Sequence, residues 1–251
     1  MVCFFIETIF QKRHTDRNMT KTIGILQTGE GAAELHASHG NYGKIWQDWL
    51  TQYASCARAR CYDVRRGILP KSPHECEGWI VTGSDDHVYD RLAWMPAAEE
   101  FLRQIFAAKV PLIGICYGHQ MLAHTLGGTV ERAKTGLEIG LKRYKWAGHA
   151  EQVVLPAYHF DQVTHMPDGA RLLASNPTCP HAALAYDDHA ITVQGHPEFT
   201  ADYLRALISL DLDDPITGPT LRDGLKSLET LTSSAASISR TLGHFLCQRS
   251  F

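Results

Sequence analysis

The 251-residue chain contains no uninterrupted apolar run near the roughly 18 residues that a membrane-spanning helix needs. It also has no excess of positive charge, because 24 Lys and Arg stand against 27 Asp and Glu and the formal net charge is −3. No basic stripe is available to contact nucleic-acid phosphates or an anionic membrane surface. We therefore expect neither nucleic acid nor a membrane as a partner.

The cysteines show no pairing pattern, since their number, seven, is odd and the sequence has no C-x-x-C. Disulfide frameworks of exported domains use even numbers of cysteines, so we expect a reduced protein in the cytoplasm. The fourteen histidines include His36 and His39, which share a helical spacing near Glu34. Because no cysteine accompanies them, we expect no metal site and no other cofactor.

Residues 1–18 form an unusual N-terminal extension. The stretch Val2–Phe10 is apolar, but the basic residues follow it, which is the wrong order for a secretory signal. We expect the extension to be disordered, with Met19 as the natural start. A short anchor on a membrane surface is the alternative.

The first half of the sequence alternates short apolar runs with segments of helical periodicity. Strands that alternate with helices at this spacing favour a parallel, doubly wound sheet, which binds ligands at the carboxyl ends of its strands. Gly83 and Cys116 both fall at such predicted ends. The predicted strands are Ile23–Gln27, Arg60–Val64, Gly78–Thr82 and Pro111–Ile115, and the predicted helices are Ile45–Tyr53, Ala97–Ala108 and His119–Leu126.

The pattern changes in the second half, where short β-like segments follow one another. They indicate an antiparallel or mixed addition to the parallel core. A helix is expected at Asp202–Leu210. We expect residues 19–212 to form one domain and residues 213–251 to form a helical tail. The β-like segments are Thr129–Arg132, Leu137–Trp146, Gln152–Leu155, Arg171–Ala174, Ala182–Tyr186 and Ala190–Gln194.

The segment Gly114–Gln120 reads Gly-Ile-Cys-Tyr-Gly-His-Gln and lies between an apolar run and a helix-like run. A strand that turns sharply into a helix needs glycines beside the turn, because the backbone there is crowded. The residue at the tip is Cys116, whose sulfur would face backbone N–H groups and a helix N-terminus. These dipoles favour the reactive thiolate. A buried structural cysteine is the alternative interpretation of this residue alone.

A second motif, Gly-His-Pro-Glu at residues 195–198, follows the apolar segment Ala190–Gln194. That strand would deliver His196 to the same sheet edge as Cys116. Imidazole is suited to pass a proton between a thiol and a leaving amine, because its ordinary pKa of about 6.5 lies near neutral pH. Glu198 can reach back and orient the ring. The two motifs thus predict a nucleophile, a base and an orienting carboxylate.

Together the two motifs resemble those of the class I (triad) glutamine amidotransferases, and the similarity extends over about Thr22 to Leu210. The resemblance implies an α/β, flavodoxin-like three-layer sandwich, with a mostly parallel central sheet and a small antiparallel β addition. It also implies a triad of Cys116, His196 and Glu198 that hydrolyses a γ-glutamyl amide through a thioester.

Supporting residues follow from the same resemblance. The backbone N–H groups of Gly83 and Tyr117 would form the oxyanion hole, and Gln120 matches the position that helps hold the glutamyl end of the substrate. Each donor of an oxyanion hole is worth on the order of 3 kcal/mol in comparable sites.

The chain departs from the synthetase-linked members of that family. Its oxyanion turn, Thr82–Asp90, is not rich in Gly-Gly-Pro, and no ATP-pyrophosphatase run such as S-G-G-x-D-S is present. The segment His159–Val163 resembles stand-alone members, including plant γ-glutamyl peptidases. We therefore expect His159 and Asp161 at the rim of the substrate pocket. A surface turn capped by Asp161 is an equally open interpretation.

These features predict an enzyme that hydrolyses or transfers the γ-glutamyl group of glutamine or of a γ-glutamyl peptide. The alternative is a glutaminase subunit that supplies ammonia to a separate synthetase. A third hypothesis, a non-catalytic ligand-sensing module, is disfavoured because such a module has no need of the thiol.

Overall fold

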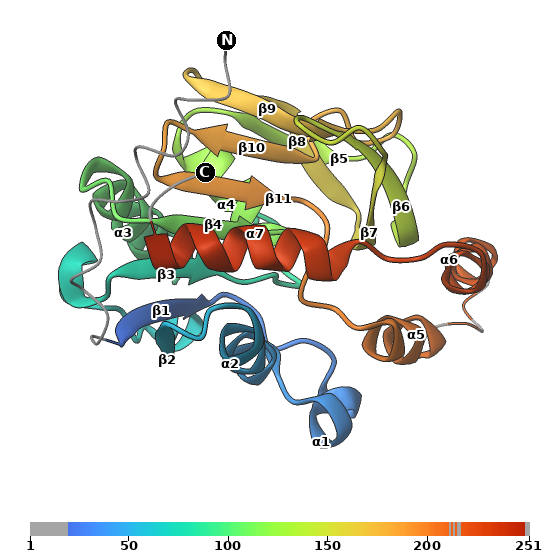
Figure 1. Ribbon diagram of the computed structural model, residues 1–251, viewed down its shortest axis with the longest axis horizontal. Coiled ribbons are helices and arrows are strands. Elements are labelled where there is room, and N and C mark those ends of the chain that lie inside the picture. Colours follow the sequence, from blue (N-terminus) through green and yellow to red (C-terminus); the bar gives the residue numbers. More distant parts are fainter. Residues whose placement is uncertain (1–19, 211, 213, 215–216, 249–251) are drawn as a thin grey trace, which may run out of the picture.

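The computed structural model describes residues 20–210, 212, 214 and 217–248, so the predicted N-terminal extension lies outside the described residues. Within the described part, nine strands form one mixed sheet in the order β2-β1-β3-β4-β11-β10-β9-β6-β7, and β5 and β8 form a separate antiparallel pair (Figure 1). The strands are β1 Lys21–Gln27, β2 Ala57–Asp63, β3 Gly78–Val81, β4 Leu112–Ile115, β5 Thr129–Arg132, β6 Glu138–Trp146, β7 Val153–His159, β8 Asp161–His165, β9 Ala170–Ser175, β10 Ala183–Tyr186 and β11 Ala190–Val193.

The strands β2, β1, β3, β4 and β11 run parallel, and β10, β9, β6 and β7 extend the sheet with antiparallel pairings. Every residue of β3, β4 and β11 is buried. This explains their continuous apolar sequences, because helices cover a parallel sheet on both faces. The sequence does not predict β8, since Asp-Gln-Val-Thr-His contains a single apolar residue and shows no strand periodicity.

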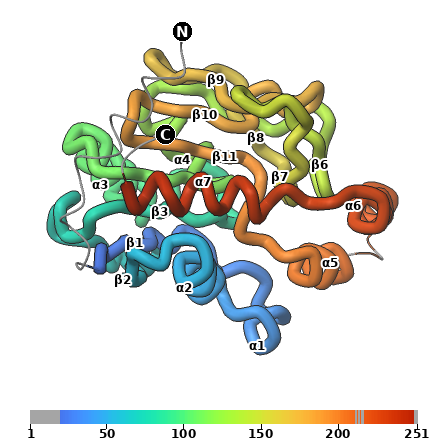
Figure 2. Tube along the Cα trace, viewed as in Figure 1, coloured from blue at the N-terminus to red at the C-terminus, as the bar shows by residue number. Residues whose placement is uncertain are grey.

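Helices complete a three-layer sandwich, which confirms the predicted flavodoxin-like fold. Helices α2 and α7 lie on one side of the parallel strands, and α3 and α4 lie on the other (Figure 2). Side chains of α2 and α7 share one core with β1, β3, β4 and β11, and side chains of α3 and α4 belong to a second core. The α-helices are α1 His36–His39, α2 Tyr42–Tyr53, α3 Met95–Ala107, α4 Tyr117–Thr125, α5 Ala201–Ser209, α6 Gly218–Thr230 and α7 Ala235–Gln248; short 3-10 turns lie at Ala33–Leu35, Val64–Arg66 and Pro73–Glu75.

Helix α2 illustrates how the sequence builds the outer layer. The Asn41 side chain accepts a hydrogen bond from the Lys44 amide at 3.0 Å and so caps the first turn. Trp46, Trp49 and Leu50 follow at spacings of three and four, and all three are buried against the sheet and α7. The predicted periodicity of this helix is confirmed.

Most of the described part of the predicted tail region is helical. Helix α6 packs against β6, and α7 places Ile238, Leu242 and Phe245 in the core beneath the sheet. Both helices are therefore packed against the rest of the fold, while the division at residue 212 stays a prediction. Among the described residues, no helix combines the length and hydrophobicity needed to cross a bilayer.

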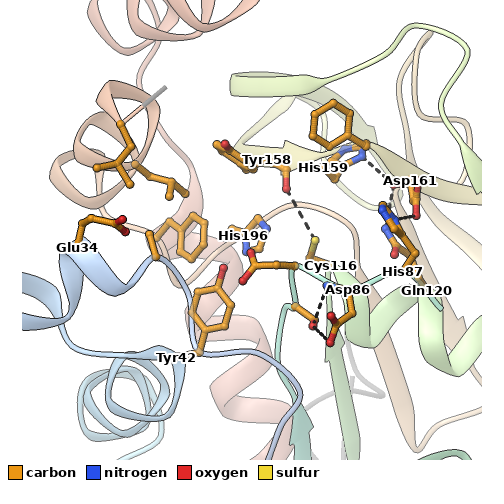
Figure 3. A pocket seen from close by; sticks show the side chains of 17 residues that line it. Glu34, Tyr42, Asp86, His87, Cys116, Gln120, Tyr158, His159, Asp161 and His196 are labelled. Carbon is orange, nitrogen blue, oxygen red and sulfur yellow. Dashed lines mark hydrogen bonds and ion pairs between the residues drawn. The ribbon is translucent and has the colours of Figure 1, made fainter. Parts of the chain in front are cut away.

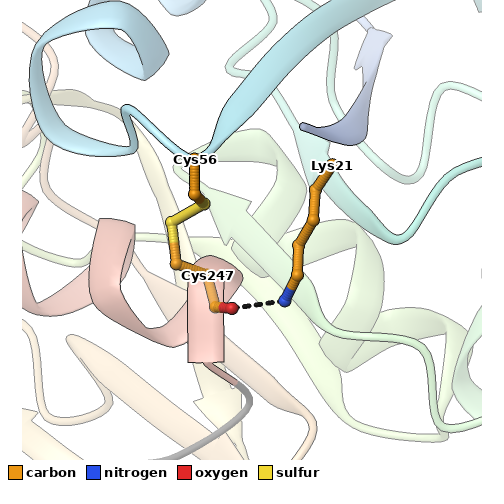
Figure 4. Close-up of a disulfide and its surroundings, with 3 residues drawn as sticks. All are labelled: Lys21, Cys56 and Cys247. Carbon is orange, nitrogen blue, oxygen red and sulfur yellow. Dashed lines mark hydrogen bonds between the residues drawn. A yellow bond between two sulfur atoms is a disulfide. The ribbon is translucent and has the colours of Figure 1, made fainter. Parts of the chain in front are cut away.

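The expectation of a fully reduced chain is wrong at two positions. Cys56, just before β2, forms a disulfide with Cys247 near the end of α7 (Figure 4). The Lys21 ammonium donates to the Cys247 carbonyl beside it. The absence of a spacing pattern did not reveal this pair, because 191 residues separate the two cysteines and only the fold brings them together. Because two cysteines are paired, the cysteines no longer indicate that the protein resides in a reducing compartment.

We expect the double variant Cys56→Ser/Cys247→Ser to lose about 2–5 kcal/mol of unfolding free energy, because the disulfide restricts the unfolded chain over a long loop. Urea unfolding of the oxidised protein, the reduced protein and the variant measures this. Peptide mapping without reductant should recover a linked Cys56–Cys247 peptide. Equal stability of all three samples would contradict the crosslink.

Candidate active site

Cys116 lies between β4 and α4, at the carboxyl edge of the parallel strands. Its backbone adopts φ +51° and ψ −103°, a conformation that costs a non-glycine residue about 1–3 kcal/mol. Hydrogen bonds hold it on both sides: the Cys116 amide donates to the Val193 carbonyl at 2.8 Å, and the Gln120 amide donates to the Cys116 carbonyl at 3.0 Å. The strained turn is therefore stabilised by β11 on one side and α4 on the other.

The glycines beside Cys116 are required by close backbone packing. A Cβ added to Gly118 would lie 2.4 Å from the Val81 carbonyl oxygen, and one added to Gly114 would lie 2.6 Å from the Gly118 carbonyl oxygen. Both distances are far below van der Waals contact. Any larger side chain at these two positions would therefore push α4 away from β3 and β4.

His196 reaches the same edge from β11, which pairs in parallel with β4. Its Nδ1 lies 2.8 Å from Glu198 Oε1, and the two side chains are only 3% and 1% exposed. The His196 amide donates to the Pro156 carbonyl at 2.8 Å, and the ring stacks on Phe199 with centroids 4.0 Å apart. Because Glu198 engages Nδ1, the other ring nitrogen, Nε2, is left to exchange a proton.

Opposing effects set the charge of His196. Burial disfavours the imidazolium, but the Glu198 carboxylate and the Cys116 sulfur outweigh burial and raise the pKa of His196 above its ordinary value. The arrangement therefore favours a protonated imidazole between two groups that can carry negative charge.

A cavity of about 560 Å³ opens onto these side chains (Figure 3). Figure 3 shows Cys116 near its centre, with His196 and Tyr42 on one side and His87, Gln120 and Asp161 on the other. Cys116 is thus a buried residue that nevertheless lines the cavity, and its role as nucleophile stays a prediction. The lining residues are Ala32, Glu34, Tyr42, Ser84, Asp85, Asp86, His87, Cys116, Gln120, Tyr158, His159, Phe160, Asp161, His196, Phe199, Leu207 and Leu210.

Gly83 follows β3 and lies next to both reactive side chains. A Cβ on Gly83 would be 3.3 Å from His196 Cε1 and 3.9 Å from Cys116 Cβ. Within the described chain, neither the Gly83 amide nor the Tyr117 amide at the start of α4 donates to a protein acceptor. Both predicted oxyanion donors are thus unpaired backbone amides beside Cys116.

The peptide that carries the Gly83 N–H is fixed through its carbonyl. The Thr82 oxygen accepts from Thr28 Oγ1 at 2.9 Å and from the Gly118 amide at 3.1 Å. A trans peptide directs its C=O and N–H to opposite sides, so these bonds also fix the direction of the Gly83 N–H. Thr28 could not be recognised from the sequence as a support of this site, because a threonine in a turn carries no signal of its own.

Gln120 lines the cavity and is held by two acceptors, the Asp161 carbonyl at 2.9 Å and Gln194 Oε1 at 3.2 Å. Gln194 in turn places its Nε2 3.6 Å from Cys116 Sγ, a contact that the sequence did not predict. His159 Nδ1 lies 2.9 Å from the same Asp161 carbonyl, so it must carry the proton. Burial lowers the pKa of His159 to about 4, so this ring is neutral and its Nε2 is an acceptor.

Asp161 begins strand β8 and is buried, so the alternative of a surface turn is wrong. Its carboxylate accepts from the Tyr89 hydroxyl at 3.1 Å and pairs with His87 Nδ1 at 2.6 Å. The His87 and Tyr89 rings stack with centroids 5.1 Å apart. The loop after Gly83 is therefore tied to β8 across the cavity. His87 and Tyr89 lie within the predicted oxyanion turn Thr82–Asp90, but nothing in the sequence marks them as site residues.

His36 and His39, the histidines considered for a metal site, contact other groups in the structure, and the His39 ring lies edge-on to Tyr203 with centroids 5.4 Å apart. His36 Nε2 lies 3.0 Å from the Glu30 carbonyl and 3.3 Å from the Gly31 carbonyl. In the part of the chain that the structure describes, no three side chains of the metal-ligating types His, Cys, Asp or Glu come together.

The fold and this site define a class: α/β proteins that carry a cysteine at a strand-to-helix turn, beside a His–Glu pair from the neighbouring parallel strand. The model of the family "glutamine amidotransferase class-I" matches residues 57–208. The chain belongs to this family of enzymes.

Individual relatives agree with the family assignment. The chain is 28% identical over 205 residues to gamma-glutamyl peptidase 3 of Arabidopsis thaliana, an alignment that covers 74% of this chain and 81% of that protein. It is 38% identical over 126 residues to the glutamine-hydrolysing GMP synthase of Clostridium novyi, which covers 47% of this chain and 24% of that protein. The crystal structure of a glutamine amidotransferase from Thermotoga maritima has a TM-score of 0.72 at 18% identity, over 92% of this chain and 99% of that one. This last likeness shows the fold.

We expect Gly118→Ala to lower the free energy of unfolding by about 1–3 kcal/mol or more, because its Cβ meets a backbone carbonyl that cannot move aside. The control is Gly148→Ala, where φ is +80° but an added Cβ meets nothing within 4 Å. Urea unfolding should show the larger loss for Gly118→Ala. A larger loss for Gly148→Ala would contradict the crowding argument.

Proposed function

We propose that the protein is a thiol-dependent hydrolase of γ-glutamyl amides, with Cys116 as nucleophile, His196 as general acid and base, and Glu198 as the group that orients His196. One observation carries this proposal: the buried His196–Glu198 pair stands beside a strained, cavity-lining cysteine at the start of a helix. A cysteine with a purely structural role would require neither the strain nor the ion-pair partner.

Acylation begins with the Cys116 thiolate, which the protonated His196 and the start of α4 stabilise. The sulfur attacks the γ-carbonyl carbon, and the new oxyanion accepts hydrogen bonds from the Gly83 and Tyr117 amides. His196 Nε2 then donates its proton to the departing nitrogen as the carbon–nitrogen bond breaks. The products of this half-reaction are a γ-glutamyl thioester and a neutral amine.

Deacylation uses the same groups in reverse. Neutral His196 removes a proton from water as the water oxygen attacks the thioester carbonyl, and the same two amides hold the second oxyanion. The carbon–sulfur bond breaks, and glutamate and the Cys116 thiolate are released. An amine in place of water would receive the glutamyl group instead, so the same site supports transfer.

The glutamyl end of the substrate is proposed to lie on the side of Gln120, His159 and Asp161. The donor of the leaving-group proton must be near the scissile nitrogen, so the leaving amine belongs on the opposite, His196 side. Leu207, which shares a hydrophobic cluster with Phe199 next to His196, also lines the cavity, so the cavity extends beyond His196 on that side. Ammonia, the leaving group of glutamine, needs no such space. The extension therefore supports γ-glutamyl peptides or larger γ-glutamyl amides as substrates.

A second candidate function is that of a glutaminase subunit that supplies ammonia to a separate synthetase. The similarity to a glutamine-hydrolysing GMP synthase, confined to about a quarter of that protein, favours it. The two functions share the chemistry of Cys116 and differ in the partner and in the leaving group.

Cys116→Ala should lower turnover of a γ-glutamyl dipeptide or γ-glutamyl p-nitroanilide by at least about 10⁴-fold, because the nucleophile is lost. A glutamine-mimicking chloroketone should add to Cys116 in the wild type, as peptide mass spectrometry will show. Cys61→Ser, a change at an exposed cysteine away from the cavity, is the control and should keep full activity. Labelling at another cysteine, or turnover by Cys116→Ala, would overturn the assignment.

A comparison of substrates separates the two functions. The γ-glutamyl peptidase function predicts that purified protein alone hydrolyses γ-glutamyl dipeptides with a higher kcat/KM than glutamine. The subunit function predicts weak glutamine hydrolysis that rises strongly only when a second protein is added. Steady-state assays of both substrates, with and without cell lysate, measure this difference.

Glu198→Gln should move the alkaline limb of the kcat/KM profile to lower pH. The carboxylate raises the pKa of His196, so without it burial dominates and the imidazolium is lost at lower pH. We expect a loss of about 10²–10⁴-fold at slightly alkaline pH. Profiles from about pH 5 to 10 should be compared with those of Asp202→Asn, an exposed carboxylate on α5. An unchanged alkaline limb would argue against Glu198 as the orienting group.

A further inference from the structure

Ser239 on helix α7 is completely buried and makes two hydrogen bonds. Its Oγ accepts from Trp49 Nε1 at 2.8 Å and donates to the Pro197 carbonyl at 3.0 Å. Pro197 lies between His196 and Glu198 in the chain. A serine 42 residues further along the sequence is thus bonded to the backbone that joins the two members of the pair.

The Pro197 carbonyl belongs to the same rigid peptide group as the Glu198 amide. The orientation of this peptide sets the direction in which Glu198 leaves the backbone. His196, Pro197 and Glu198 form a turn, and its other end is held by the bond from the His196 amide to the Pro156 carbonyl. Ser239 is therefore the support of the turn on the side of α2 and α7.

On the side of α2 and α7, packing alone does not fix the turn of His196, Pro197 and Glu198. A second cavity, of about 360 Å³, borders it and is lined by Trp49, Pro197, Glu198 and Ala235 among others. Glu198 Oε2 is buried and has no hydrogen-bond partner among the described residues, so the carboxylate is held by its one bond to His196 and by its backbone. A small rotation of the Pro197–Glu198 peptide would change the His196–Glu198 distance directly.

We propose that Ser239 is a positioning residue of the active site: its hydroxyl, through the bond to the Pro197 carbonyl, holds the peptide that sets the distance between Glu198 and His196. The expected effect on kinetics rests on the proposed function. The expected effect on the His196–Glu198 pair does not depend on that function. Both α7 and Trp49 lie outside the segment that matches the family model. The support is therefore supplied by parts of this chain beyond the family core.

Two variants separate positioning from a purely structural role. Ser239→Ala removes the donor to Pro197. Trp49→Phe removes the Nε1 donor to Ser239 but keeps the Ser239–Pro197 bond. Both replace a buried hydrogen-bonded side chain, so both should lower the urea midpoint. A purely structural Ser239 would give these two variants the same active-site behaviour.

The direct readout is an NMR titration of the His196 ring in each variant. The groups that act on this ring are Glu198, Cys116, Asp85 and His159. Ser239→Ala weakens the contact with Glu198, so the pKa of His196 should fall by about one unit. In Trp49→Phe it should stay at the wild-type value. An equal shift in both variants, or no shift in Ser239→Ala, overturns the proposal.

Kinetics give the second readout. With γ-glutamyl p-nitroanilide, Ser239→Ala should lower kcat about tenfold while KM stays within about twofold, because ground-state binding does not use Glu198. Trp49→Phe should change kcat less than threefold. If Ser239→Ala does not fold, Ser239→Cys fills the site with a slightly larger side chain that is a much weaker donor, and it should give the same shifts. If no γ-glutamyl compound is turned over, the proposed function fails, and the NMR titration still decides the role of Ser239.

Discussion

The strained backbone at Cys116 is the constraint on which the rest of the site depends. A positive φ at a residue with a side chain is unfavourable, and it persists because β11 and α4 hold the peptide groups on both sides of it. The crowding at Gly114 and Gly118 is the geometric consequence, since α4 must start directly against β3. The same contact supplies the Gly118 amide that anchors the Thr82 carbonyl. One local conformation therefore places the sulfur, the start of the helix and the direction of the Gly83 amide together.

The charge of the site results from competition between burial and proximity. A buried imidazole alone would lose its proton more easily, as His159 does on the other side of the cavity. His196 is equally buried, but the carboxylate of Glu198 and the sulfur of Cys116 reverse the outcome. The pKa values of two histidines in one cavity are thus shifted in opposite directions, that of His159 toward the neutral ring and that of His196 toward the cation. Acid–base chemistry at neutral pH requires such a separation between the pKa values of titratable groups in one site.

The sequence predicted the parts of this arrangement that follow from local rules. The alternation of apolar and helical segments led to the sandwich, and the glycines around Cys116 led to the turn, because each depends on a few neighbouring residues. The meeting of Cys116 and His196 at one sheet edge could also be predicted, because both follow parallel strands, but most other side-chain contacts between distant segments could not. Nothing local in Thr28, Gln194 or His87 indicates the partner that each meets only after folding. Strand β8 was missed for a related reason: its pairing with β5, and not its own hydrophobic pattern, makes it a strand.

The same distinction explains why the C-terminal region could be predicted as helical but not interpreted. The spacing of its leucines predicts a helix with one apolar face. Which elements that face packs against depends on the whole fold. In the structure, α7 completes the core beneath the parallel strands, and the disulfide at Cys247 joins its far end to the segment before β2. A helix held at one end by a covalent bond and along its length by packing is a rigid support. Its single buried serine can therefore transmit that rigidity to the turn that carries His196 and Glu198.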